Sequence, residues 1–161
     1  MPHNDRIVKQ VKDKLMALAD LCDSGYLLAV HIRYTRPTLM YTTYPSIWLE
    51  HYGEKGMMMV DPVVLWAMSE TTEAGVAHWT DLAGNDPAGV IAGSAAHGLH
   101  NGMSFAVGPI TSRTIGSVTK STAFTAQETA LAEMLVTAIH NLTNGLEKMD
   151  QATQDVLRGL S

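Results

Sequence analysis

The spacing of apolar residues predicts a helix near each end of the chain. In residues 4–22, apolar side chains recur at every third or fourth position, and charged side chains occupy the opposite face. Near the other end, Thr125 and Glu128 have the spacing of a capping box, which marks a helix start. The apolar stripe after the box predicts one long helix, and its members are Leu131, Leu135, Ala138, Leu142 and Met149.

Two pairs of β-rich segments predict hairpins. Residues 26–34 are rich in β-branched and aromatic side chains, and residues 36–38 predict a turn into a second strand at 39–44. Residues 103–110 and 114–124 have the same character and are joined by a short Thr-Ser-Arg connection. Short connections imply antiparallel pairing within each pair.

The chain between the hairpins predicts three helical pieces and a loop. Residues 45–55 predict a helix with its proline in the first turn. Asp61 and Pro62 have the residue types of an N-cap and a first helical position, so a second helix begins there. Residues 69–89 hold turn-forming residues and predict a loop, whereas the small residues of 87–102 predict a third helix.

This order of elements predicts an α+β fold. Helices at both ends of the chain and between the hairpins imply that both faces of the sheet are covered. We therefore expect one domain over residues 1–161, an α-β-α sandwich around a twisted antiparallel sheet of about five strands. This arrangement resembles the PAS and GAF sensor folds, in which a cavity often lies between the sheet and one helical layer.

Composition excludes several classes of protein. A chain of 161 residues with 46% hydrophobic and 17% charged residues is typical of a globular domain. No apolar run approaches the ~18 residues that span a bilayer, and a single cysteine, Cys22, suits a reducing cytoplasm. A net charge of −5 without a basic cluster argues against direct binding of nucleic acid. The ten methionines fit either a soft core or an adaptable pocket wall.

Polar aromatic residues and a carboxylate form the candidate site. Tyr44, Trp48 and Tyr52 recur at every fourth position, so a helix would present them on one face, and Asp61 follows. Tyrosine can donate or accept a hydrogen bond, tryptophan only donates and a carboxylate only accepts. This set fits a ligand with carbonyl oxygens, an N–H group and apolar bulk. The alternative is structural, because Asp61 can simply cap a helix and aromatic faces are often core.

No motif in the chain indicates an enzyme or a metal site. His97 and His100 have a spacing that can share a face, but no acidic or cysteine partner lies nearby in the sequence. The chain has no nucleophile elbow, HExxH, P-loop or dinucleotide fingerprint. We therefore expect no catalytic residues, no metal and no cofactor.

Four segments together resemble the autoinducer-binding domain of LuxR-type quorum-sensing regulators. They are "YPSIWLEHY", "VDPVV", "HW" and "AAHGLHNGMSFAVG", in this order and spacing. The resemblance covers nearly the whole chain and implies an N-acyl homoserine lactone as the ligand. It implies that Trp48 donates to the lactone carbonyl, that Asp61 accepts from the amide N–H, and that Tyr44 donates to the acyl carbonyl.

The resemblance implies further contacts and shows two departures. Thr119 would place a second hydroxyl near the acyl carbonyl, although a strand residue there can also face solvent. Tyr52, Val63 and Trp79 would pack against the ligand. The family usually has proline where this chain has Ala106, and an aromatic residue near the position of its Met-Met-Met run. The loss of that aromatic residue suggests a roomier acyl pocket.

The resemblance also implies partners. We expect a homodimer, with the long C-terminal helix as its surface, and DNA contact only through a helix-turn-helix domain that these 161 residues do not contain. Two alternatives remain open. One is a stand-alone domain that pairs with full-length regulators and modulates them, and the other is a GAF-like sensor of a different small amide or aromatic ligand.

Overall fold

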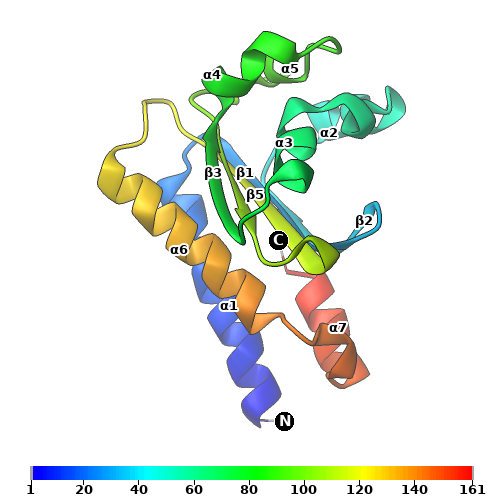
Figure 1. Cartoon of the computed structure of the whole chain (residues 1–161). Coiled ribbons are helices and arrows are strands. Elements are labelled where there is room, and N and C mark those ends of the chain that lie inside the picture. Colours follow the sequence, from blue (N-terminus) through cyan, green and yellow to red (C-terminus); the bar gives the residue numbers. More distant parts are fainter. Residues whose placement is uncertain (1, 161) are drawn as a thin grey trace.

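A five-stranded antiparallel sheet lies between two helical layers (Figure 1). The computed structural model describes residues 2–160. The strand order is β2-β1-β5-β4-β3, so the first hairpin joins the second through β1 and β5. The predicted α+β sandwich is confirmed. The strands are β1 Gly25–Arg33, β2 Arg36–Thr42, β3 Ala74–His78, β4 Met103–Val107 and β5 Arg113–Thr119.

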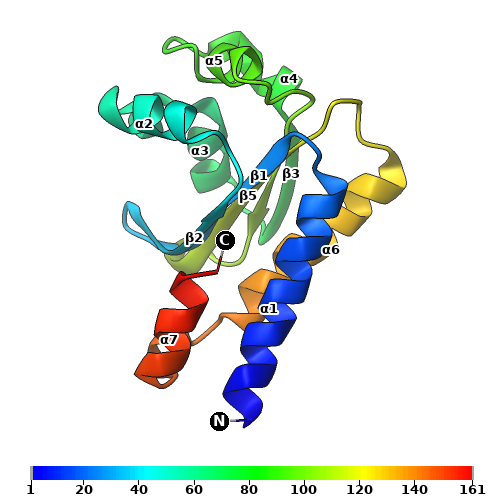
Figure 2. The ribbon, with the colours of Figure 1, turned by 180° about the vertical axis from the view of Figure 1, so that it is seen from behind.

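The helices divide between the two faces of the sheet (Figures 1 and 2). One face carries α1 Pro2–Leu21, α6 Ala126–Leu142 and α7 Gln151–Arg158. The other face carries α2 Ser46–Glu54, α3 Pro62–Ser69, α4 Trp79–Leu82 and α5 Val90–Ala96. Short 3₁₀ turns connect them: η1 Met57–Val60, η2 Ala83–Asn85, η3 Ile110–Ser112 and η4 Leu146–Lys148. No helix among residues 2–160 is long and apolar enough to cross a lipid bilayer.

The alternation of side chains along the strands produces two separate cores. On one face, Leu28, Tyr41 and Phe105 pack against the apolar stripe of α1 and against α6. Gly116 brings β5 close to α6, since a Cβ atom there would lie 2.8 Å from a methyl group of Val136. On the other face, Ile115 and its neighbours pack against the shorter helices α2 to α5. The two longest helices, α1 and α6, therefore cover one face, and the helices of the other face have nine residues or fewer.

Two predictions about the strands were wrong. Residues 74–78 form strand β3 rather than a loop, because they pair with β4 along its whole length. Their sequence, Ala-Gly-Val-Ala-His, lacks the β-branched run typical of strands, so only the pairing partner specifies the strand. The first hairpin turns at residues 34–35, not 36–38, and Pro37 lies in edge strand β2, where a missing N–H is tolerated.

The predicted C-terminal helix was also too long. Helix α6 ends at Leu142, and the chain then turns through Gly145, whose φ of 75° favours glycine. Asp150 caps the separate helix α7 by accepting from Thr153 N. The apolar stripe runs on to Met149 because η4 and α7 pack into the same core as α6. The third predicted helix, 87–102, is limited to Val90–Ala96.

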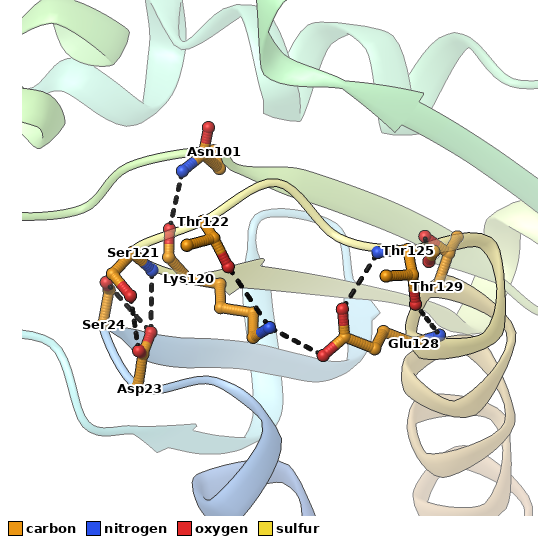
Figure 3. Close-up of polar contacts among 9 residues, drawn as sticks. All are labelled: Asp23, Ser24, Asn101, Lys120, Ser121, Thr122, Thr125, Glu128 and Thr129. Atoms are coloured by element: carbon orange, nitrogen blue, oxygen red, sulfur yellow. Dashed lines mark hydrogen bonds and ion pairs between the residues drawn. The ribbon is translucent and has the colours of Figure 1, made fainter.

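A polar network fixes the loop between β5 and α6 (Figure 3). Asp23 accepts hydrogen bonds from both the backbone N–H and the hydroxyl of Ser121, at 2.8 and 2.6 Å. Lys120 forms an ion pair with Glu128 at 2.7 Å. Glu128 also completes the predicted capping box with Thr125, which is confirmed. This network ties the end of α1, the end of β5 and the start of α6 together.

A buried histidine pair joins β1 to α6 on the face of the long helices. His31 lies at an irregularity in β1, has a φ of 50° and contacts the backbone oxygen of His140 through Nε2 at 3.0 Å. The ring centroids lie 4.3 Å apart. Thr114 Oγ1 accepts from His31 N, so its own hydrogen is available to His140 Nδ1, 2.6 Å away. Burial lowers the pKa of both rings, that of His140 to about 4.

Acid is predicted to weaken the fold through this pair. An unfolded histidine binds a proton near its ordinary pKa of 6.5, whereas the folded His140 does so only near pH 4. The unfolded state therefore binds more protons in this window, and the free energy of unfolding falls as the pH is lowered. For His140 alone we expect a loss of about 2 kcal/mol between pH 7.5 and pH 5, measured by urea unfolding.

The control uses an exposed histidine. His140→Gln removes the titrating ring and should flatten the dependence of stability on pH, whereas His78→Gln, at an exposed position, should leave it unchanged. If the free energy of unfolding of His140→Gln depends on pH as steeply as that of the unaltered protein, His140 is not the source of the acid sensitivity.

Candidate functional site

A cavity of about 600 Å³ lies between the sheet and the layer of short helices. Alternate residues of three strands form its floor. In a first row, Leu27 of β1 lies between Thr42 of β2 and Ser117 of β5. In the next row, Ala29 lies between Met40 and Ile115. Residues from α2, η1, α3 and α5 form the roof. The cavity thus lies between the sheet and one helical layer, as is common in this type of fold.

A buried arginine anchors α3 over the sheet. Arg113, at the start of β5, is 2% exposed and donates to four carbonyl groups. Two of these are Ala67 O and Glu70 O, at 2.8 and 2.7 Å, at the C-terminal end of α3. Such charge-assisted bonds satisfy carbonyl groups that a helix end leaves unpaired. Arg113 therefore holds one wall of the cavity in place.

The predicted aromatic residues all line the cavity. Trp48 and Tyr52 lie on α2 with their rings 6.3 Å apart in an edge-to-face arrangement. Tyr44 lies two residues before the helix begins, yet it lines the same space. Its hydroxyl oxygen is buried and has no hydrogen-bond partner, and it alone has this status among the side chains that the structure describes. Burial and the nearby Asp61 raise the pKa of this phenol.

Asp61 caps α3 and lines the cavity at the same time. One carboxylate oxygen accepts from Val63 N at 2.9 Å, and the other accepts from the Tyr52 hydroxyl at 2.8 Å. Burial raises the pKa of Asp61, whereas these two hydrogen bonds lower it. A carboxylate offers about four acceptor positions, so two remain for a ligand. The capping and ligand-binding interpretations of Asp61 are therefore compatible.

A hydrogen-bonded chain of three side chains reaches the cavity from β4 and β5. Trp79 Nε1 donates to Ser104 Oγ at 2.9 Å, and Ser104 Oγ lies 2.7 Å from Ser117 Oγ. Since the indole can only donate, the hydrogen of Ser104 is available to Ser117. When Ser104 is the donor of this pair, the hydroxyl hydrogen of Ser117 can point into the cavity that this residue lines.

Thr119 lies outside the lining of the cavity. It is fully buried, and its hydroxyl donates to Gly25 O at 2.7 Å. Ser117, which was not singled out in the sequence, lines the cavity instead. Thr119 and Ser117 lie two residues apart and share one face of β5, because side chains alternate along a strand.

Glycines and small residues make room for the two indoles. Trp48 and Trp79 are 3% and 7% exposed, and both line the cavity with Val63. A Cβ atom at Gly93 would lie 2.7 Å from the Trp48 ring, and one at Gly102 would overlap the Trp79 ring. The small-residue segment that supplies these glycines therefore positions the aromatic walls.

The two histidines considered as metal ligands do not form a metal site with other described residues. His97 Nδ1 contacts Gly93 O at 2.9 Å, and its ring packs 5.0 Å from that of Trp48. His100 is exposed. Within the described part of the chain, no group of three histidine, cysteine or acidic side chains has metal-binding geometry.

Comparison with known families decides the affiliation. The family model described as "Autoinducer binding domain" matches residues 9–144. The chain belongs to this family. The resemblance to LuxR-type quorum-sensing regulators is thereby confirmed.

Solved structures share the fold of this autoinducer-binding domain. Escherichia coli SdiA has 22% identity and a TM-score of 0.64, over 89% of this chain and 62% of that chain. SdiA in complex with octanoyl-rac-glycerol has 21% identity and a TM-score of 0.62. The match covers 89% of this chain and 60% of that chain. CepR2 from Burkholderia cenocepacia, an N-acylhomoserine lactone dependent LuxR family transcription factor, has 17% identity and a TM-score of 0.57, over 89% and 94%. The domain thus spans about three fifths of these SdiA chains. No curated protein sequence matches it.

The serine chain of this autoinducer-binding domain is predicted to contribute to its stability. Ser104→Ala removes the acceptor of the buried Trp79 N–H and should lower the free energy of unfolding by about 1–3 kcal/mol. Urea unfolding measures this loss. Ser46→Ala, at an exposed position at the start of α2, is the matched control. A loss no larger than that of the control would show that the Trp79 hydrogen bond is unimportant.

Proposed function

We propose that this domain is the non-enzymatic ligand sensor of a quorum-sensing regulator and binds an N-acyl homoserine lactone in its cavity. The observation that carries the proposal is the buried, unpartnered hydroxyl of Tyr44 beside the carboxylate of Asp61. An unpaired buried hydroxyl costs about 1–3 kcal/mol, so a ligand carbonyl that accepts from it is strongly favoured. Membership of the autoinducer-binding family supports this choice of ligand.

Each polar group of the lactone head has a partner in the proposed complex. Trp48 donates to the lactone carbonyl, and Asp61 accepts from the amide N–H. Tyr44 donates to the acyl carbonyl, and Ser117 provides the second hydroxyl there in place of Thr119. Tyr52 orients Asp61 through their hydrogen bond, while Val63 and Trp79 pack against the ligand.

The head group and the acyl chain play different energetic parts. Each buried methylene contributes ~0.8 kcal/mol, whereas each net hydrogen bond contributes only ~0.5–1.5 kcal/mol. The acyl chain therefore supplies most of the affinity, and the head group supplies the identity of the ligand. A fatty acid would place a second negative charge beside Asp61, which disfavours it.

The outer face of α6 suits a second copy of the domain. Leu131 and Met134 are 39% and 60% exposed, although both are apolar. Seven exposed or half-exposed residues of this face are uncharged: Gln127, Ala130, Leu131, Met134, Thr137, Ala138 and Asn141. The half-exposed Glu133 lies at their edge. We propose a homodimer through this face in the cytoplasm. DNA contact would then belong to a helix-turn-helix domain outside these 161 residues.

Tyr44→Phe is predicted to separate binding from folding. Loss of the unpartnered hydroxyl should leave the free protein at least as stable, while lactone affinity falls about 2- to 10-fold. Tyr41→Phe is the matched control, because the Tyr41 hydroxyl donates to Leu157 O in the opposite core. That variant should lose stability and keep its lactone affinity. Thermal unfolding and calorimetric titration measure the two quantities, and an unchanged affinity in Tyr44→Phe would refute its assigned contact.

Asp61→Asn tests the carboxylate in the same assay. Asparagine can still cap α3, so the fold should persist while lactone affinity drops. An equal affinity would reduce Asp61 to a helix cap. If no lactone of any length raises the melting temperature of the unaltered protein, the proposed ligand is wrong.

Met134→Glu is predicted to convert a dimer to a monomer. A charge in the centre of the apolar face of α6 would be desolvated in the dimer without a partner. Ile47→Glu is the control, because Ile47 is 66% exposed and belongs to α2, a helix that lies far from α6 in both views (Figures 1 and 2). Light scattering coupled to gel filtration gives the mass. A dimeric Met134→Glu variant would exclude this face.

A further inference from the structure

The floor of the cavity changes character along its length. Ser117 lies in the first row of the floor, and Tyr44 follows Thr42, which belongs to the same row. The lining at the other end comes from Ile32 and Pro37, paired across the first hairpin, and from the turn beyond them. Ser69 also lines the cavity, but its hydroxyl already donates to the carbonyl of Leu65 at 2.6 Å.

The cavity opens at the surface beside exposed hydrophobic residues of its lining. They are Tyr34 at 98% exposure, Met59 at 70%, Leu65 at 49% and Met40 at 45%. They come from the β1–β2 turn, β2, η1 and α3. Both views place this turn on the side of the sheet that α2 and α3 cover (Figures 1 and 2). We refer to these four residues as the apolar rim.

The length of the floor sets a scale for the ligand. From Leu27 to Tyr34 the chain advances seven residues, which is roughly 20 Å at ~3.3 Å per residue, the bulge included. Bond lengths near 1.5 Å and angles near 111° advance an extended carbon chain by about 1.25 Å per carbon. By the same geometry, a lactone ring and its amide take roughly 7 Å. The remaining length accommodates about ten carbons.

We propose that this domain selects lactones with long acyl chains of about ten carbons or more, and that the apolar rim binds the end of the chain. This inference rests on the proposed function. Two of the four rim residues are methionines, Met40 and Met59, whose flexible side chains can close over the last carbons of chains of different length. Contact with the chain in turn removes exposed apolar surface of the protein from water.

The test is a series of unsubstituted lactones with four to fourteen acyl carbons, titrated against the 161-residue chain. We expect affinity to rise about fourfold per added methylene while the chain is being buried. The rise should continue to about ten carbons and then level off as the chain passes the rim. Affinity that peaks at six or eight carbons would overturn the proposed selection while leaving lactone binding intact. An absence of binding at every length would overturn the proposed function itself.

A double variant tests the rim directly. Met59→Ser combined with Leu65→Ser should weaken binding of the twelve-carbon lactone by roughly tenfold or more and leave the six-carbon lactone nearly unchanged. Both residues are exposed, so the fold should tolerate the change. The matched control combines Ile47→Ser with Val76→Ser, which are exposed apolar residues outside the lining. If the double variant loses affinity equally for both lactones, or for neither, the rim does not bind the end of the acyl chain.

Discussion

The packing of α1 and α6 against one face of the sheet is the constraint on which the cavity depends. Side chains of these long helices fill that face completely, and residues such as Leu28, Phe105 and Val136 have no exposed surface. A close-packed core of this kind supplies most of the stability of a domain. The other face can therefore carry short helices that leave a space between them and the strands. A cavity costs stability, and the filled core offsets that cost.

Two polar anchors keep the roof of the cavity in place although it is loosely packed. Arg113 binds the end of α3 from the sheet, and Asp61 caps the start of the same helix. Tyr52 links α2 to Asp61. The polar residues of the candidate site are thus bonded to the helix ends that they position. A ligand that binds Asp61 would for this reason also act on the packing of α2 and α3, which suits a sensor.

The lining of the cavity combines a few polar groups with many apolar side chains. Four methionines, Met40, Met58, Met59 and Met68, line it. Methionine adapts its shape to irregular guests. Of the two interpretations that the composition left open, the position of these four residues favours the adaptable pocket wall.

Local signals in the sequence were sufficient for the ends of several elements and for most of the site. The capping box at Thr125 and the N-cap at Asp61 are short-range hydrogen bonds, so the residue types alone predicted them. The spacing of Trp48 and Tyr52 predicted two residues of one lining, because a helical repeat brings such positions to one face. Tyr44 lies before α2, so its place in the same lining does not follow from the helical repeat.

Features that depend on residues distant in the sequence could be seen only in the tertiary structure. Strand β3 exists because β4 pairs with it, and its own residues carry no strand pattern. The choice of Ser117 over Thr119 depends on which residue has its hydroxyl bound by Gly25, ninety-four positions away. By itself the sequence determined most of the helices, the two hairpins and the residue types of the candidate site. Only the folded chain determined which hydroxyl is free, because hydrogen-bond partners are assigned by contact in space and not by order along the chain.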